Sequence, residues 1–190
     1  MYSSLPKLVV IEGVDAVGKT TIARMLEDAF GYNYLYTPQA PFNVVRTLVE
    51  EMEDINTRFF YYLSSVIGVQ PQLKSMLSSG KKVVVDRYVH STIAMHTVLG
   101  AKVGSVAMRE LPVVWPDVGI LLTAETNVRI KRMESRAKKP THDKRIERFV
   151  KEAEEAEVIY RSFNDLSPID TTNLSIDQVF VVVSQLLRSP

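Results

Sequence analysis

Short apolar runs alternate with longer stretches of helical periodicity along most of this chain. The apolar runs predict five strands, at residues 7–11, 32–36, 83–86, 118–122 and 168–170. Between them, apolar residues recur every three or four positions, which is the spacing of a helix that packs on a sheet. This alternation is typical of an α/β protein in which helices cover a parallel sheet.

The periodic stretches predict helices over residues 20–30, 44–53, 58–79, 91–99, 103–109, 126–135, 143–163 and 176–187. Gly68 and Pro71 predict a kink near the middle of the 58–79 helix. Residues 136–142 match neither period and include a proline, which predicts a loop. Because a chain of 190 residues fits one domain, we expect a single domain over 1–190.

The composition excludes several classes of protein. The net charge of +1 gives no indication of a nucleic-acid or membrane surface. The absence of cysteine excludes a disulfide framework, a thiolate metal site and a cysteine nucleophile. No apolar run approaches the roughly 20 residues of a membrane span, and residues 1–6 are too short and polar for a secretory leader. We therefore expect a cytoplasmic protein that binds neither nucleic acid nor membrane.

One motif carries most of the chemical information. Residues 13–20 read GVDAVGKT and match Gly-x4-Gly-Lys-Thr, between a predicted strand and a predicted helix. In such a P-loop, backbone N–H groups point at phosphate, Lys19 reaches the β- and γ-phosphates, and Thr20 ligates Mg²⁺. The residues expected to bind the phosphates of ATP are Gly13, Ala16, Val17, Gly18, Lys19, Thr20 and Thr21.

Charged residues at the strand ends complete the candidate site. Asp86 and Arg87 end the third strand, at the carboxyl edge where α/β proteins bind ligands. Asp86 is a candidate ligand for Mg²⁺ or its water shell, and Arg87 a candidate for an acceptor phosphate. Asp15, inside the P-loop, could face an acceptor hydroxyl or a metal-bound water. For Glu12, a structural hydrogen-bonding role and a catalytic role both stay open.

Residues 129–148 contain nine Lys or Arg and three acidic residues. One interpretation is a solvated helix face with internal ion pairs. Beside a phosphate loop, the other interpretation is a mobile basic flap that closes over polyphosphate. We expect this LID segment at about residues 133–146.

Together these motifs resemble the thymidylate kinase family of nucleoside monophosphate kinases. The matching segments are residues 10–21, 85–92 and 121–123, together with Arg129, Arg132 and Arg136. Their order and separations follow the family from about residue 7 to residue 188. Residues 88–92 also resemble the mitochondrial UMP-CMP kinase branch of this superfamily.

The resemblance implies a three-layer fold of the P-loop NTP hydrolase type, with a five-stranded parallel sheet and a short basic LID. It implies that ATP and Mg²⁺ are the cofactors and that a pyrimidine nucleoside monophosphate, most often dTMP, accepts the phosphoryl group. It also implies a homodimer built from the helices beside the third strand. The acceptor-binding residues implied are Asp15, Pro38, Arg46, Phe60, Ser64, Arg87, Ser91, Thr92 and Met95.

The P-loop holds Ala16 and Val17 where some relatives carry an arginine. Phosphoryl transfer develops charge that a lysine and Mg²⁺ rarely neutralise alone, so an arginine must come from elsewhere. The candidates in the basic segment are Arg132 and Arg136, with Arg145 a further one and Arg129 closer to a structural role. The predicted catalytic residues are Asp15, Lys19, Arg87, Arg132 and Arg136.

Base recognition departs from the family pattern. Family members usually stack thymine on an aromatic residue and bind it with an arginine one helical turn later. That pair falls on Phe60 and Ser64 or on Tyr62 and Val66, so neither register supplies the arginine. Arg58 lies on the other side of the aromatic residue. We choose Phe60 for stacking, and the polar candidates for reading the base are Ser64, Ser65, Gln70 and Gln72.

The motifs also bear on three alternative functions. A UMP, CMP or dCMP kinase, or a nucleoside kinase on the same scaffold, is the nearest alternative, although Arg87 with Arg46 favours a monophosphate acceptor. A GTP-dependent switch needs Asn-Lys-x-Asp, which does not occur, and its Asp-x-x-Gly matches only inside the P-loop. A catalytically silent nucleotide-binding protein is disfavoured by the set of Lys19, Thr20, Asp86 and Arg87.

Overall fold

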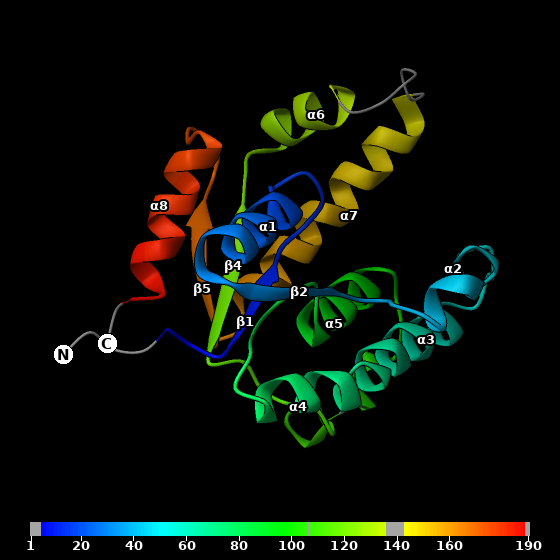
Figure 1. Ribbon diagram of the computed structural model, residues 1–190. Coiled ribbons are helices and arrows are strands. Elements are labelled where there is room, and N and C mark those ends of the chain that lie inside the picture. The colour runs from blue at the N-terminus through cyan, green and yellow to red at the C-terminus, as the bar shows by residue number, and fades with distance from the viewer. Residues whose placement is uncertain (1–4, 106, 136–142, 189–190) are drawn as a thin grey trace.

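A five-stranded parallel sheet forms the centre of the computed structural model, which describes residues 5–105, 107–135 and 143–188 (Figure 1). For residues 105 and 143–149 it describes the backbone alone. The strands are β1 (Leu8–Glu12), β2 (Tyr32–Tyr36), β3 (Lys82–Asp86), β4 (Val118–Thr123) and β5 (Leu166–Asp170). Their order is β2-β3-β1-β4-β5, and every neighbouring pair is parallel. The predicted five-stranded parallel sheet is confirmed.

The three central strands are buried on both faces. All five residues of β1 are buried, as are Val83–Asp86 of β3 and residues 119–123 of β4. Such continuous apolar runs are typical of parallel strands covered by helices on both sides. The edge strands β2 and β5 instead include exposed positions, as their mixed sequences YNYLY and LSPID require.

Helices form the outer layers (Figure 1). α1 packs against α8, while α5 packs against both α3 and α7. The helices are α1 (Lys19–Phe30), α2 (Phe42–Glu50), α3 (Ile55–Gly68), α4 (Gln70–Ser78), α5 (Val89–Val98), α6 (Thr126–Glu134), α7 (Asp143–Arg161) and α8 (Ile176–Leu186). None of the helices in the described ranges is long and apolar enough to cross a membrane.

Two of the predicted helices differ from those in the structure. The predicted 58–79 helix is divided at Val69 into α3 and α4, with Pro71 in the first turn of α4, where a missing N–H is tolerated. The predicted helix over 103–109 is wrong, because that segment forms two 3₁₀ turns, Val103–Ser105 and Met108–Glu110. Among the residues of this stretch whose burial the structure describes, only Val103 is buried, which is too little to stabilise an amphipathic helix. The predicted loop at 136–142 lies outside the described residues.

Candidate active site

The P-loop joins β1 to α1 at the carboxyl edge of the sheet. Gly13, Ala16 and Gly18 have φ angles of 131°, 66° and 103°, which turn the chain sharply before α1 begins at Lys19. A Cβ at Gly13 would lie 2.2 Å from the carbonyl oxygen of Leu122, so only glycine fits there. The N-terminus of α1 therefore opens onto the loop, and its free N–H groups favour an anion.

Lys19 is enclosed at the base of the loop. Its Nζ donates to the carbonyl oxygen of Val14 at 2.7 Å and lies 4.0 Å from Oδ1 of Asp15. Burial, and after it the charge of Arg87, lowers the pKa of Lys19 to about 7, although Asp15 and Asp86 act in the other direction. An anion bound here would favour the ammonium form and raise that pKa.

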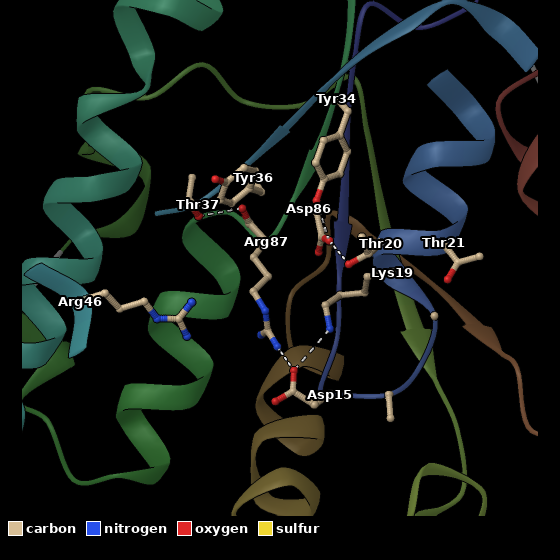
Figure 2. Close-up of a pocket in the computed structure, with 12 residues that line it drawn as sticks. Asp15, Lys19, Thr20, Thr21, Tyr34, Tyr36, Thr37, Arg46, Asp86 and Arg87 are labelled. Carbon is tan, nitrogen blue, oxygen red and sulfur yellow. Dashed lines mark hydrogen bonds and ion pairs between the residues drawn. The ribbon is translucent and has the colours of Figure 1, made fainter. Parts of the chain in front are cut away.

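Asp86 and Thr20 meet beside Lys19, as Figure 2 shows. The Oγ1 of Thr20 donates to Oδ2 of Asp86 at 2.5 Å, and the hydroxyl of Tyr34 donates to the same oxygen at 3.3 Å. A carboxylate and a hydroxyl are hard oxygen donors, and Mg²⁺ uses only one or two such protein ligands beside nucleotide phosphates. The donor set therefore fits the predicted metal. Within the described residues there is no cluster of three or more acidic or histidine ligands.

Arg87 contacts Asp15 across the opening of the site (Figure 2). Its φ angle of 68° is unusual for a side chain of this size, and two backbone contacts hold it there. Its N–H donates to the carbonyl oxygen of Ile11 at 3.1 Å, and its own carbonyl accepts from Oγ1 of Thr37 at 3.0 Å. Such strain at a strand end aims the guanidinium at the P-loop. Burial raises the pKa of Asp15, but the charges of Arg87 and Lys19 outweigh it, so the pKa is lowered.

Two cavities adjoin at Asp15 and Arg87. The first, of about 270 Å³, lies over the P-loop and includes Lys19, Thr20 and Asp86. The second, of about 370 Å³, extends between α3 and α5. The residues that line the second cavity are Asp15, Thr37, Pro38, Arg46, Arg58, Tyr62, Arg87, Tyr88, Ser91, Thr92, Met95, His96 and Leu99. Most of the predicted acceptor-binding residues are thus brought together.

Phe60 and Ser64 are the exceptions, because the structure places them outside this cavity. Both are exposed and neither lines the cavity, whereas Tyr62 does. Because each helical residue turns by about 100°, Phe60 points almost opposite to Tyr62. Arg58, four residues before Tyr62, lies on the same face and also lines the cavity.

The other polar candidates for reading the base do not reach the cavity either. Ser65 is buried and donates to the carbonyl oxygen of Tyr62 at 2.7 Å. Gln70 is buried between Tyr88 and Val114, with bonds of 2.7 and 2.9 Å. Gln72 is exposed on α4. The sequence prediction set Arg58 aside although its i, i+4 spacing from Tyr62 was a usable signal, and it missed His96, which no motif marks.

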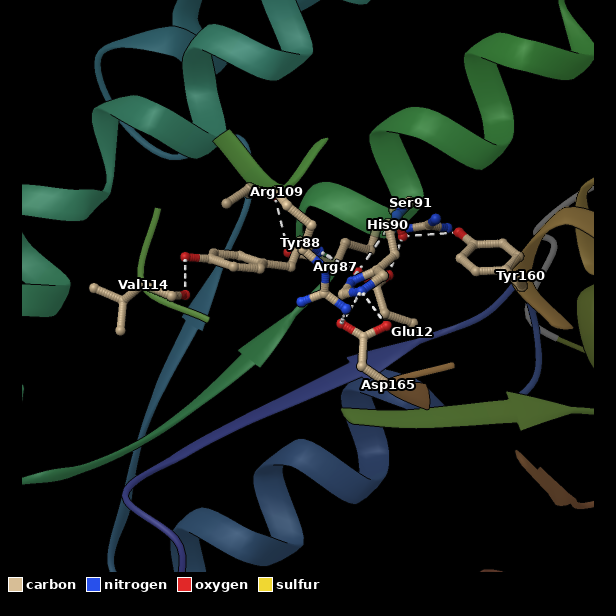
Figure 3. Close-up of polar contacts among 10 residues, drawn as sticks. Glu12, Arg87, Tyr88, His90, Ser91, Arg109, Val114, Tyr160 and Asp165 are labelled. Carbon is tan, nitrogen blue, oxygen red and sulfur yellow. Dashed lines mark hydrogen bonds and ion pairs between the residues drawn. The ribbon is translucent and has the colours of Figure 1, made fainter. Parts of the chain in front are cut away.

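Of the two roles left open for Glu12, its contacts support the structural, hydrogen-bonding one. It is fully buried, and its Oε1 accepts from the N–H groups of Tyr88 at 2.9 Å and Ser91 at 3.3 Å. The Oγ of Ser91 donates to its Oε2 and accepts from the hydroxyl of Tyr160 at 2.8 Å (Figure 3). Glu12 therefore fixes the turn that carries Arg87.

A buried histidine links this turn to the surface (Figure 3). The Nδ1 of His90 lies 3.4 Å from Oε1 of Glu12, and its Nε2 lies 3.2 Å from both carboxylate oxygens of Asp165. Asp165 in turn pairs with the exposed Arg109 at 3.1 Å. Burial lowers the pKa of His90, but hydrogen bonding and charge from Glu12 and Asp165 outweigh it and raise the pKa above its usual value.

Two arginines of α6 bind backbone carbonyl oxygens of the P-loop. Arg129 is buried, and its Nε donates to the carbonyl oxygen of Asp15 at 3.2 Å. Arg132 donates to the carbonyl oxygens of Ala16 at 3.3 Å and Thr171 at 2.8 Å. Arg136 and most of the predicted LID lie outside the described residues. A further cavity of about 390 Å³ opens here, lined by Val17, Gly18, Thr21, Arg132, Thr171, Leu174, Ile176 and Val179.

Comparisons with known proteins agree on one family. The thymidylate kinase family model matches residues 11–180. A probable thymidylate kinase of Methanococcus maripaludis is 27% identical over 183 residues, covering 92% of this chain and 91% of the relative. One of Sulfurisphaera tokodaii is 30% identical over 133 residues, covering 68% and 70%. The solved structure of thymidylate kinase from Candida albicans shares the fold, with a TM-score of 0.75 at 16% identity, covering 96% of this chain and 91% of that one.

Proposed function

This chain belongs to the thymidylate kinase family, and from that premise we propose that it transfers the γ-phosphoryl group of ATP to dTMP, giving ADP and dTDP. The observation that carries the proposal is the pair of cavities that adjoin at Asp15 and Arg87. One cavity contains the phosphate-binding loop, and the other is a separate compartment for an acceptor. A simple nucleotide-binding protein has no need of the second compartment.

In the first cavity, the P-loop and Lys19 hold the phosphates of ATP. Thr20 and Asp86 would hold Mg²⁺, which would neutralise negative charge on the phosphates of ATP. The phosphate-binding residues are those of the sequence prediction: Gly13, Ala16, Val17, Gly18, Lys19, Thr20 and Thr21. The cavity behind the loop, with its apolar wall of Leu174, Ile176 and Val179, suits the flat adenine ring.

In the second cavity, Arg87 binds the acceptor phosphate and Arg46 supports it. A phosphate monoester has its second pKa near 6, so its oxygen is already ionised at neutral pH and needs no general base. Asp15 therefore acts by orienting Arg87 and Lys19, both of which it contacts. Pro38, Ser91, Thr92 and Met95 form the wall around the sugar and base.

Arg132 and Arg136 remain the proposed sources of the extra arginine for the transferring group. Arg132 already meets the P-loop through the carbonyl oxygen of Ala16, at 3.3 Å. The closing LID at about 133–146, the homodimer and the cytoplasmic location are proposals that rest on the resemblance to the family.

The test is an ADP-release assay with ATP and Mg²⁺ across dTMP, dUMP, UMP, CMP, dCMP, AMP, GMP and the free nucleosides. We expect the highest kcat/KM with dTMP and no turnover of free thymidine, because thymidine lacks the group that Arg87 binds. Transfer to none of the monophosphates would refute the proposed function.

A further inference from the structure

The second cavity has a phosphate end and a far end. α5 starts next to Arg87 and runs for ten residues, about 15 Å, away from the P-loop. α3 begins beside the far end of α5, because the N–H of Lys102 donates to Oδ1 of Asn56 at 2.9 Å. Arg58, in the first turn of α3, and His96, in the last turn of α5, therefore line the end of the cavity that is remote from Arg87.

Arg58 brings a positively charged, donor-only side chain to this far end. Its Nε is shielded from solvent and has no hydrogen-bond partner within the described residues. A guanidinium offers donors only, and a shielded donor without a partner costs free energy. Because a shielded Nε is out of a ligand's reach, a ligand in the cavity meets the terminal N–H groups of this donor-only side chain, which favour a carbonyl oxygen.

His96 offers the opposite group. Its Nδ1 lies 2.8 Å from the carbonyl oxygen of Thr92, which can only accept, so Nδ1 carries the hydrogen. Burial lowers the pKa of His96; the bond to Thr92 opposes this and the charge of Arg58 adds to it, so the net lowering favours the neutral ring. Nε2 then presents a lone pair, and no partner for it is found in the part of the chain that the structure describes. The ring of Tyr62, 5.1 Å away, forms the adjoining aromatic wall.

We propose that Arg58 and His96 select the acceptor base, with Arg58 donating to its 4-carbonyl oxygen and His96 Nε2 accepting from its N3–H. This rests on the proposed function, which puts a pyrimidine monophosphate in this cavity with its phosphate at Arg87. The sugar is attached at N1, so the edge with O4 and N3–H points toward the far end. Thymine and uracil match this donor and acceptor pair. Cytosine in the same orientation places an amino group against Arg58 and an unprotonated N3 against His96.

The selecting arginine thus stands one helical turn before the aromatic residue, whereas the family pattern has it one turn after. In this chain the later position is Val66, which is buried in the core. The two arrangements use the same face of the helix, because positions i−4 and i+4 flank the same ring.

The experiment measures kcat/KM for dTMP, dCMP and N3-methyl-dTMP in the wild type and in Arg58→Met and His96→Phe. Loss of a charged hydrogen bond lowers kcat/KM for dTMP by about 10- to 100-fold in Arg58→Met, mainly through KM for dTMP. The dCMP value and the KM for ATP stay within about threefold. N3-methylation impairs the wild type but makes little further difference in His96→Phe. Arg161→Met, the same change at a half-exposed arginine of α7, alters none of these constants.

Arg58→Lys keeps the positive charge and is expected to retain part of the preference for dTMP, which separates base selection from folding. Equal losses on dTMP and dCMP in Arg58→Met would overturn the inference, because a structural defect is blind to the base. A wild type that prefers dCMP would overturn it while leaving the kinase function intact. A wild type that phosphorylates no monophosphate would overturn the proposed function first, and the inference with it.

Discussion

The phosphate end and the base end of the site are built in different ways. At the phosphate end, short segments of chain supply the groups, and these groups already contact one another. Arg87 contacts Asp15, Thr20 donates to Asp86, and Lys19 donates to the backbone. At the base end, the groups come from two helices, and the Nε of Arg58 is without a partner among the described residues.

The difference follows from what each end must recognise. Phosphate groups are the same in every nucleotide, so a fixed loop of N–H groups and a few charges can bind them. Bases differ in where they carry donors and acceptors, so selecting one requires particular side chains at particular places. The phosphate end therefore depends on backbone geometry, and the base end depends on the packing of α3 against α5.

The largest expected effect comes from a substitution that changes the phosphate end alone. Lys19→Met removes a buried ammonium that faces the transferring group, and we expect kcat to fall by about 10³-fold. Because this end is blind to the base, the fall should be the same with dTMP and dUMP. Single-turnover and steady-state ADP release measure it, and Lys74→Met, at an exposed lysine of α4, is the control. Turnover near the wild-type rate would contradict the assignment of Lys19.

The elements that the sequence predicts well are those with local causes. β1 and β3 are runs of β-branched residues, and the P-loop is a contiguous motif whose glycines are needed for its φ angles. The carboxyl edge of a parallel sheet then brings residues 15, 20, 86 and 87 together. For the phosphate end, motif and topology were sufficient.

The base end could not be predicted in the same way. Whether Phe60 or Tyr62 faces the ligand depends on how α3 is rotated against α5, which is a property of tertiary packing. A shift of two residues turns the side chain to the opposite face, which is why the structure places Tyr62 at the cavity and Phe60 outside it. Arg58 and His96 are far apart in sequence, and only the antiparallel contact of the two helices brings them to one cavity.

A smaller effect tests which aromatic residue serves the base. We expect Tyr62→Leu to raise the KM for dTMP by about tenfold, from loss of an aromatic contact worth about 1 kcal/mol or more, with little change in kcat. Phe60→Leu, on the same helix but 52% exposed, should leave KM within about twofold. Initial-rate kinetics of both variants measure the contrast. A larger rise in KM from Phe60→Leu than from Tyr62→Leu would contradict the orientation of α3 in which Tyr62 faces the cavity.

The smallest expected effect is on the pH dependence of the free energy of unfolding. A histidine at each end contributes to it with opposite sign. The pKa of His90, beneath the phosphate end, is raised in the folded state. Its contribution to stability is therefore complete below the unfolded pKa of about 6.5 and is lost as the pH rises through the folded pKa. We expect the stabilisation of wild type relative to His90→Asn to shrink above pH 6.5, by at most about 1.4 kcal/mol per pH unit. Urea unfolding between about pH 5 and pH 9 measures this difference for both histidines.

His96, at the base end, is the matched control with the opposite sign. Its pKa is lowered, so its contribution is present above about pH 6.5 and is lost as the pH falls through that value toward its folded pKa. Lys19, whose pKa of about 7 is also lowered, adds stability as the pH rises above 7, but this cancels in a difference between variants. If His90→Asn and His96→Asn gave differences of the same sign, Glu12 and Asp165 would not hold a proton on His90. The turn that carries Arg87 would then be fixed by the hydrogen bonds of Glu12 alone.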